Sequence, residues 1–288
     1  MAARDSRRSK DGGLSMSSDR SRGFTGSSVA EGYDQFLLGQ LFVPWAHDLV
    51  GRAGLTPTQR VLDVASGLGP VARLAAAAVG AGGEVVASDI SAPMLARASE
   101  YASRPAAAAI EYLECSATSI ASDDDRFDAV LCQQGVQFFP ERAQAAGEMA
   151  RVVRADGVVV VSAWASERPL GLFGPIAETL AELDFAEPYP GAFNPSSYSL
   201  SVGELGQLLI GAGLRDVVVV TATVDAIWPS LDEAVSTLLG TPFNPLVAAR
   251  PADEQQRVRA VLAKKFHQSG EGTIVVATTA NTAVGYKG

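Results

Sequence analysis

The sequence has few of the residues that build disulfide frameworks or metal sites. Among its 288 residues there are two cysteines, Cys115 and Cys132, and two histidines, His47 and His267. Two cysteines cannot form the bridged framework of a small secreted domain, so we expect a reducing compartment, the cytoplasm. Neither C-x-x-C nor H-x-x-x-H spacing occurs. We therefore predict that the protein binds no metal.

The sequence also lacks a long apolar run and an excess of positive charge. No run approaches the ~18 apolar residues of a membrane span, so we expect no membrane association. The net charge is −9; residues 1–23 carry six basic and three acidic residues, a net +3, which leaves −12 for the remainder. Such a body is a poor electrostatic partner for nucleic acid. These absences favour small-molecule chemistry.

Segments typical of strands and helices alternate along most of the chain. We predict helices at 70–80, 92–103, 141–154 and 202–212, and strands at 61–65, 84–88, 109–113, 127–133, 157–164, 216–224 and 273–280. The nearly continuous apolar run at 157–164 is typical of a parallel strand covered on both faces. This order predicts an α/β fold with a doubly wound, mostly parallel, seven-stranded sheet.

We expect residues 1–28, rich in Ser and Gly, to be a disordered tail, and residues 29–288 to form one domain. Two segments rich in proline or aromatic residues, 167–200 and 225–270, interrupt the alternation. We interpret them as helical lid insertions near the carboxyl edge of the sheet, where ligands bind in such folds. Their aromatic residues suggest an apolar or aromatic ligand of metabolite size; a small core inside the lid is an equally open interpretation.

A glycine turn follows the first predicted strand. Gly67 and Gly69 let the backbone approach a ligand closely, and a helix begins directly after them. About twenty residues later Asp89 ends the next strand, where a carboxylate can accept two ribose hydroxyls. The spacing Gly67-x-Gly69-x-x-Ala72 also satisfies a dinucleotide fingerprint, so an NAD(P)-dependent oxidoreductase stays an alternative. Asp63, two residues before the turn, is unusual for a dinucleotide loop.

Five segments in order resemble the motifs of class I S-adenosylmethionine-dependent methyltransferases. Asp63-x-Ala65-Ser66-Gly67-x-Gly69 resembles the first motif, usually Asp-x-Gly-x-Gly-x-Gly. The others lie at 88–95, 127–130, 132–140 and 151–157, and Cys132 to Pro140 is most similar to the branch of the quinone-biosynthesis methyltransferases. The resemblance implies a Rossmann-like methyltransferase fold, S-adenosylmethionine as cofactor and a small-molecule acceptor.

The resemblance also implies roles for individual residues. Asp63 would help to hold the ammonium group of the cofactor, Asp89 its ribose hydroxyls, and Ile90 and Met94 its adenine face. The cofactor-binding residues that it implies are Tyr33, Asp63, Ala65, Ser66, Gly67, Gly69, Asp89, Ile90, Met94, Ser116, Ala117, Cys132 and Gln133. Trp45 is a further candidate to close over the cofactor, with packing as the alternative.

Two departures from the family pattern matter for function. Ala65 stands where glycine is usual, and Ser116 stands where an aspartate would accept from the adenine amino group. Ser116 keeps open a third hypothesis, a methyltransferase fold that acts as a non-methylating cyclase. Methyl transfer needs a base only when the acceptor arrives protonated, and His267 is the candidate. The acceptor, the atom methylated and the choice between monomer and homodimer stay open.

Overall fold

The protein is built on one sheet. The computed structural model describes residues 26–288 except 103, 169–170, 189–190, 267 and 270–271. The strands are β1 (Arg60–Val64), β2 (Glu84–Asp89), β3 (Ile110–Glu114), β4 (Phe127–Gln133), β5 (Val153–Ala165), β6 (Ser199–Leu200), β7 (Leu214–Trp228), β8 (Gln268–Ser269) and β9 (Thr273–Lys287).

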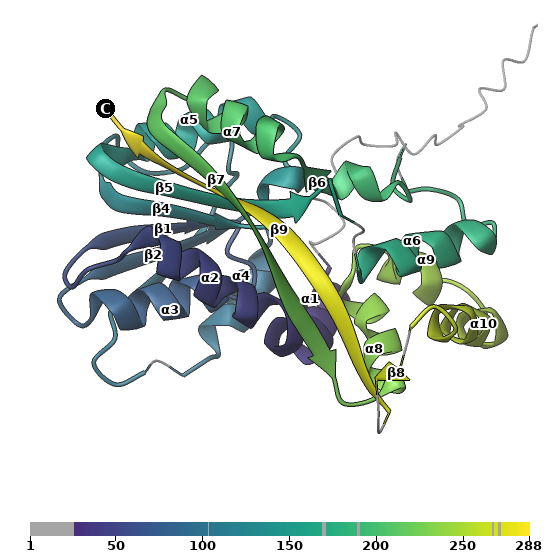
Figure 1. Cartoon of the computed structure of the whole chain (residues 1–288). Coiled ribbons are helices and arrows are strands. Elements are labelled where there is room, and N and C mark those ends of the chain that lie inside the picture. Colours follow the sequence, from purple (N-terminus) through teal and green to yellow (C-terminus); the bar gives the residue numbers. More distant parts are fainter. Residues whose placement is uncertain (1–25, 103, 169–170, 189–190, 267, 270–271) are drawn as a thin grey trace, which may run out of the picture.

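The main strands follow the order β3-β2-β1-β4-β5-β9-β7 (Figure 1). Strands β1 to β5 pair in parallel, whereas β9 runs antiparallel to both β5 and β7. The predicted doubly wound, mostly parallel sheet is confirmed. Its seven main strands are those predicted, and the two short strands β6 and β8 are additional. The crossovers place the carboxyl ends of β1, β2 and β4 at one edge, where loops can meet a ligand.

Helices cover both faces of the sheet because alternate residues of each buried strand point to opposite sides. Val61 packs with α2 (Val43–Ala53) and α3 (Pro70–Val79), whereas Leu62 and Val64 pack on the side of α5 (Arg142–Val152) and α7 (Val202–Gly211). Figure 1 shows α2 and α3 below the sheet and α5 and α7 above it. Helix α4 (Ala92–Ser99) follows β2 and contacts β2 and β3.

A helical segment at the start of the domain leads into the sheet. It consists of α1 (Ser27–Tyr33), the π-helical turn η2 (Asp34–Phe42) and α2. Ser27 and Ser28, which we expected in the tail, are therefore helical. The segment buries Leu37 and Leu41, and it stacks the ring of Tyr33 on that of Phe42 with centroids 4.5 Å apart. This stack fixes the position of Tyr33 above the carboxyl edge.

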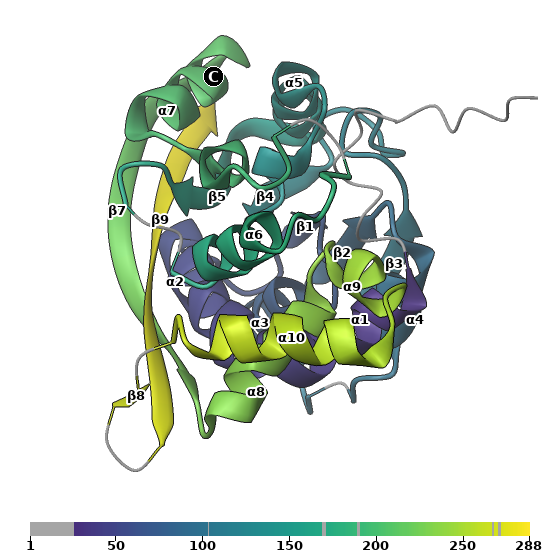
Figure 2. The same ribbon diagram turned by 90° about the vertical axis from the view of Figure 1, so that its right-hand side faces the viewer.

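The inserted segments form a helical cap beside that edge. The cap contains α6 (Phe173–Glu182), η4 (Pro195–Tyr198), α8 (Leu231–Ser236), η5 (Thr237–Gly240), α9 (Asn244–Ala248) and α10 (Ala252–Ala263). Figure 2 shows α6, α9 and α10 together on this side of the molecule. Among the described helices, none is long and apolar enough to cross a bilayer.

Strands β7 and β9 are much longer than predicted. Each has 15 residues, and β7 continues to Trp228, into the segment predicted to be an insertion. The extension of β7 is stable because Trp228 and its partner on β9, Ile274, are buried against the cap. The Trp228 indole also donates to the Phe36 carbonyl oxygen at 2.9 Å. The long antiparallel pair of β7 and β9 thus ties the cap to the sheet (Figure 1).

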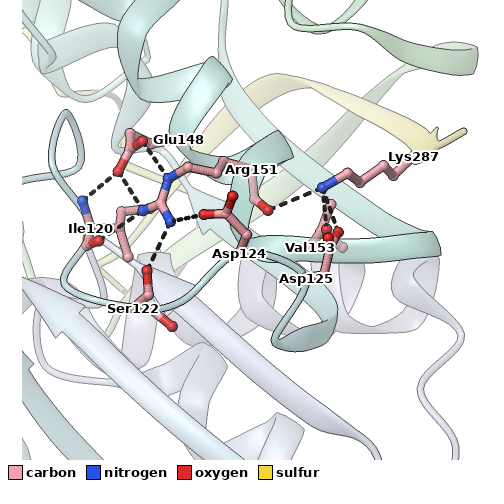
Figure 3. A network of polar contacts seen from close by, with 8 residues as sticks. All are labelled: Ile120, Ser122, Asp124, Asp125, Glu148, Arg151, Val153 and Lys287. Atoms are coloured by element: carbon pink, nitrogen blue, oxygen red, sulfur yellow. Dashed lines mark hydrogen bonds and ion pairs between the residues drawn. The ribbon is translucent and has the colours of Figure 1, made fainter.

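A polar network at the amino end of β4 holds the loop after β3 in place (Figure 3). Arg151 at the end of α5 donates to Glu148 Oε1 at 2.7 Å, to Asp124 Oδ1 at 2.7 Å and to the carbonyl oxygens of Ile120 and Ser122. Lys287 of β9 donates to the Arg151 carbonyl oxygen at 3.0 Å. The network fastens α5 and the C-terminal strand together, away from the carboxyl edge.

Candidate functional site

The loop between β1 and α3 turns sharply at the carboxyl edge of the sheet. Ala65, Gly67 and Gly69 all have positive φ angles, of 55°, 53° and 70°. Glycine adopts such angles without strain, whereas alanine does so at a cost. The Ser66 N–H donates to the Ser88 carbonyl oxygen at 2.9 Å, which clips the loop to the end of β2.

Asp89 at the end of β2 binds the glycine loop. Its Oδ2 accepts the Gly67 N–H and its Oδ1 accepts the Ser91 N–H, both at 2.8 Å. Burial raises the pKa of this half-buried carboxyl, and the backbone N–H donors oppose the rise. Each carboxylate oxygen can accept a second hydrogen bond, so Asp89 keeps capacity for two ligand hydroxyls.

Asp63 lies deeper, at 1% exposure. Its Oδ2 accepts the Ala72 N–H at 3.0 Å, while its Oδ1 has no hydrogen-bond partner among the described residues. Burial, with a smaller contribution from the Asp89 charge, raises the pKa of Asp63 to about 8. Burial and the two carboxylates also raise the pKa of Tyr33 well above its ordinary value. The floor of the site is therefore acidic and close to Tyr33.

The start of α3 offers few donors to an anion. Pro70, the first helical residue, has no N–H, and the Ala72 N–H is bound to Asp63. The Arg73 N–H donates to the Gly69 carbonyl oxygen at 3.0 Å. Of the first three helical residues, only Val71 keeps an N–H for a ligand. A pyrophosphate at a helix N-terminus needs several.

A pocket opens above this loop, between the carboxyl edge and the cap. It brings together most of the predicted cofactor residues: Tyr33, Ala65, Gly67, Asp89, Ile90, Met94, Ser116, Ala117 and Gln133. Asp89 is the one acidic residue of the lining, and none of the described lining residues is Lys, Arg or His. The pocket therefore suits a cation better than an anion.

Other predicted residues do not reach the pocket surface. Asp63 lies beneath the glycine loop, and Ser66 and Gly69 belong to the loop but do not line the pocket. Cys132 is fully buried, because β4 turns its side chain under Gly135, and it does not line the pocket. His267 lies outside the described residues.

Trp45 does not close over the cofactor site, because packing occupies it. Its indole donates to Thr278 Oγ1 at 2.9 Å and meets the ring of Trp164 edge-on, with centroids 5.9 Å apart.

The second end of the pocket is aromatic. The rings that line it belong to Phe138, Phe139, Trp164, Phe173, Tyr198 and Phe243. Several also pack on one another; the Tyr198 ring lies 5.7 Å from that of Phe138 and 6.2 Å from that of Phe243. The aromatic residues of the inserted segments were expected either to contact an apolar ligand or to form a small core of their own. The two arrangements are compatible, since the same rings form a cap core and the wall of the pocket.

Residues 240–243 lie in a segment predicted to be a lid insertion, but the sequence pattern did not single out Gly240, Thr241 or Pro242. Residues 240–243 line the pocket although they follow no motif. They reach it because two glycines allow backbone contact: a Cβ on Gly32 would lie 2.4 Å from the Leu239 carbonyl carbon, and one on Gly240 would lie 2.7 Å from the Tyr33 nitrogen. Thr118 was also missed; its Oγ1 lies 2.8 Å from Ser116 Oγ.

Among the described residues, no group of three or more His, Cys, Asp and Glu side chains could hold a metal ion.

Comparison with known proteins agrees with this geometry. Residues 62–161 match the family model described as a methyltransferase domain. Residues 62–161 form a class I S-adenosylmethionine-dependent methyltransferase domain. The match runs from β1 through the glycine loop and Asp89 into β5, and so includes the loop, the acid and the end of β4.

Sequence relatives match about half of the chain. An uncharacterized protein of Mycobacterium tuberculosis is 36% identical over 141 residues, 49% of this chain and 49% of its own length. The ubiquinone/menaquinone biosynthesis C-methyltransferase UbiE of Xanthomonas campestris is 34% identical over 137 residues, 46% of this chain and 53% of its own. The chain spans about half the length of the curated relatives it matches.

Solved structures share the fold over nearly the whole chain. The Haemonchus contortus phosphoethanolamine N-methyltransferase 2 in complex with S-adenosyl-L-methionine has a TM-score of 0.60 at 16% identity, covering 96% of this chain and 60% of its own. The [4+2]-cyclase SpnF has a TM-score of 0.59 at 15% identity, covering 93% and 96%. At such identities the likeness shows the fold of the methyltransferase domain and its cap.

Proposed function

We propose that the protein transfers a methyl group from S-adenosylmethionine to a small apolar or aromatic metabolite. The observation that carries the proposal is one continuous pocket with an acidic floor at Asp89 and a wall of aromatic rings at its other end. A donor with a sulfonium and an ammonium group suits the acidic end. An apolar acceptor suits the aromatic end.

Orphaned polar atoms in the floor fit such a donor. Asp63, buried beneath the loop with its Oδ1 unpartnered, would attract the ammonium group from below once it is ionised, and the free acceptor capacity of Asp89 would take the ribose hydroxyls. Ile90, 44% exposed, would cover one face of the adenine together with Met94. Ser116 and Ala117 would meet the adenine edge, and Tyr33 and Gln133 would enclose the methionine part.

When bound, S-adenosylmethionine supplies a methyl group already activated by its sulfonium. The protein's own part is alignment: the loop at Gly67 and the end of β4 orient the donor, and the cap excludes water from the acceptor. Among the described residues, the titratable side chains that line the pocket are Tyr33, Asp89, Cys115 and Tyr198. His267 stays the predicted base for an acceptor that arrives protonated.

The acceptor is proposed on two grounds. The aromatic wall suits a planar or apolar body, and the relative in Xanthomonas campestris is a C-methyltransferase of ubiquinone/menaquinone biosynthesis. We therefore propose an acceptor ring of that general kind in a biosynthetic reaction. We place the reaction in the cytoplasm, in keeping with the free thiols of Cys115 and Cys132. The alternatives of O-, N- and C-methylation stay open.

An oxidoreductase with a dinucleotide is the alternative that the loop fingerprint raised. The blocked amides at the start of α3 and the acidic floor disfavour a pyrophosphate. Thermal unfolding with S-adenosylhomocysteine and with NAD in parallel tests this. Stabilisation by S-adenosylhomocysteine supports the proposal, and stabilisation by NAD alone would overturn it.

A non-methylating cyclase is the second alternative, and the fold of SpnF is compatible with it. Incubation with labelled methyl donor and a panel of phenols, quinols and apolar amines distinguishes the two. Transfer of label to any acceptor supports methyl transfer. Tight donor binding without transfer to any member of a broad panel would favour the cyclase.

A further inference from the structure

A second cleft lies on the face of the sheet that α2 and α3 cover, beside β3. Parts of α2, α3, β3 and the chain after α4 line it, and the side chains that matter are Val43, His47, Arg73, Tyr101, Arg104 and Tyr112. It shares no lining residue with the donor pocket. No described residue of its lining is Asp or Glu. A cleft of this composition is unexpected on a chain of net charge −9.

Arg73 is the central cation of the cleft. Its side chain is half-buried, and its guanidinium lies over the ring of Tyr101, 4.1 Å from the centroid. One nitrogen, Nη1, donates to the Leu68 carbonyl oxygen at 2.5 Å. No ion pair joins Arg73 to any described acid, and burial lowers the pKa of its guanidinium. These contacts hold the guanidinium in one position. The N–H groups of Nε and Nη2 make no hydrogen bond to a described residue and can donate to a ligand.

Arg104 and His47 also lack acidic partners. The exposed side chains of Arg104 and His47 make no hydrogen bond or ion pair with any described residue. The neighbouring acids are engaged elsewhere: both carboxylate oxygens of Asp48 accept from Arg52 at 2.8 Å, and Asp34 accepts from Tyr101 and Arg97. No described acid therefore forms an ion pair with Arg73, Arg104 or His47, although Asp34 and Asp63 act on Arg73 electrostatically and raise its pKa against the effect of burial.

We propose that this cleft is a binding site for a small oxoanion, a carboxylate or a phosphate monoester, attached to an aromatic or apolar body. A held guanidinium with free donors recognises such oxygens in a bidentate manner. The rings of Tyr101 and Tyr112 and the side chain of Val43 supply a surface for the apolar body. The site is independent of the methyl-donor function, since the acidic pocket above the glycine loop would repel the same ligand.

Isothermal titration of the full chain with inorganic phosphate, phenyl phosphate and benzoate tests the proposal. The protein is saturated with S-adenosylhomocysteine and the ionic strength is kept constant. We expect phenyl phosphate or benzoate to bind, and to bind more tightly than inorganic phosphate, because the ring adds apolar contact. Comparison of phenyl phosphate with benzoate decides between a phosphate and a carboxylate.

Three variants locate the binding. Arg73→Gln should weaken it about tenfold or more, since a charge-assisted bidentate contact is lost, and Arg104→Ala about threefold, as expected for an exposed charge. Arg257→Ala is the matched control; Arg257 is an exposed arginine of α10 that pairs with no described residue and lies outside the cleft lining, so its loss changes the net charge equally. It should leave affinity within about twofold.

Arg104→Ala also guards against misfolding, because the exposed Arg104 side chain has no described partner to lose. No binding of any of the three probes at millimolar concentration would overturn the proposal. Equal weakening by Arg257→Ala and Arg104→Ala would overturn it as well, since attraction would then be general. A probe that binds the protein only when S-adenosylhomocysteine is left out would place the anion in the donor pocket and not in this cleft, and would overturn the proposal. If the donor fails to bind while phenyl phosphate still does, the methyltransferase proposal fails and this one stands.

Discussion

The Gly67 N–H donates to Asp89 Oδ2 at 2.8 Å, although 22 residues separate the two. The glycine turn and the acid of the next strand are thus one unit, held together before any ligand binds. Ser91 completes it by donating to the other carboxylate oxygen. A cofactor that contacts either part meets a preformed surface, which lowers the cost of ordering the loop on binding.

Asp89→Asn should weaken the binding of S-adenosylhomocysteine by ~1–3 kcal/mol, because one of the two carboxylate oxygens becomes an amide that cannot accept ribose hydroxyls. Titration calorimetry measures the change. Glu114→Gln is the control: Glu114 ends β3, pairs in register with Asp89 and is exposed outside the pocket lining. It should bind as the wild type does. An Asp89→Asn variant with unchanged affinity and unchanged unfolding temperature would remove Asp89 from the donor site.

Asp63 should make the protein less stable as the pH rises. Its pKa in the folded chain is about 8, far above the ordinary value of 3.8. The folded state therefore holds the proton more tightly than the unfolded state, and the free energy of unfolding falls between about pH 4 and pH 8. Below pH 4 the carboxyl is protonated in both states, so its contribution there is flat.

Asp63→Asn isolates this effect, because the amide stays neutral. Denaturant unfolding of both proteins is measured without ligand. From pH 4 to pH 8, the free energy of unfolding of the variant should rise relative to that of the wild type by at least about 1 kcal/mol. A difference that stays constant with pH would mean that Asp63 ionises normally in the folded protein.

The parallel half of the fold was predictable because its pattern is local. Strand β4 has the predicted bounds, 127–133, and β1, β2 and β3 differ by one residue at an end or two. Buried parallel strands are short apolar runs, and glycine turns or polar loops end them. The glycine loop and Asp89 followed from spacing for the same reason.

The antiparallel half and the cap were harder to predict. The C-terminal extension of β7, residues 225–228, begins with the exposed Asp225 and was predicted to belong to an insertion, whereas pairing with residues 274–277 of β9 makes it a strand. Residues 240–243 reach the pocket through backbone contact with α1, more than 200 residues away along the chain. Cys132 was placed in the pocket by motif, but the alternation of β4 turns it inward. Such placements depend on tertiary contacts that no local pattern contains.

Ser116→Asp should strengthen donor binding. The family's aspartate accepts from the adenine amino group, and a carboxylate at this position would restore that bond, worth ~0.5–1.5 kcal/mol. Affinity for S-adenosylhomocysteine measures the gain. Ser119→Asp is the control, since Ser119 is exposed, bridges to Ser116 through the backbone and does not line the pocket. An equal gain in both variants would indicate a general charge effect and not a new hydrogen bond to the adenine amino group.

Ala65 and Gly135 should be coupled. A Cβ on Gly135 would lie 2.8 Å from the Ala65 Cβ, closer than atoms of this kind pack, and Ala65 itself has a positive φ of 55°. Gly135→Ala alone should therefore destabilise the fold and the loop, by about 1–3 kcal/mol as an overpacked contact. Ala65→Gly alone should be close to neutral, because relief of backbone strain offsets the added freedom of the unfolded chain.

The double variant decides whether this contact is the cause. Removing the Ala65 Cβ leaves space for an alanine at 135, so Ala65→Gly/Gly135→Ala should recover part of the loss, with a coupling energy of about 0.5–3 kcal/mol. Full recovery is not expected, since the new Cβ would still lie 3.1 Å from Cys132 Sγ. Denaturant unfolding of the four proteins gives the coupling energy directly. A coupling near zero would show that the backbone at 135 moves away without involving Ala65, and the close approach of the glycine loop to the end of β4 would then not constrain the donor pocket.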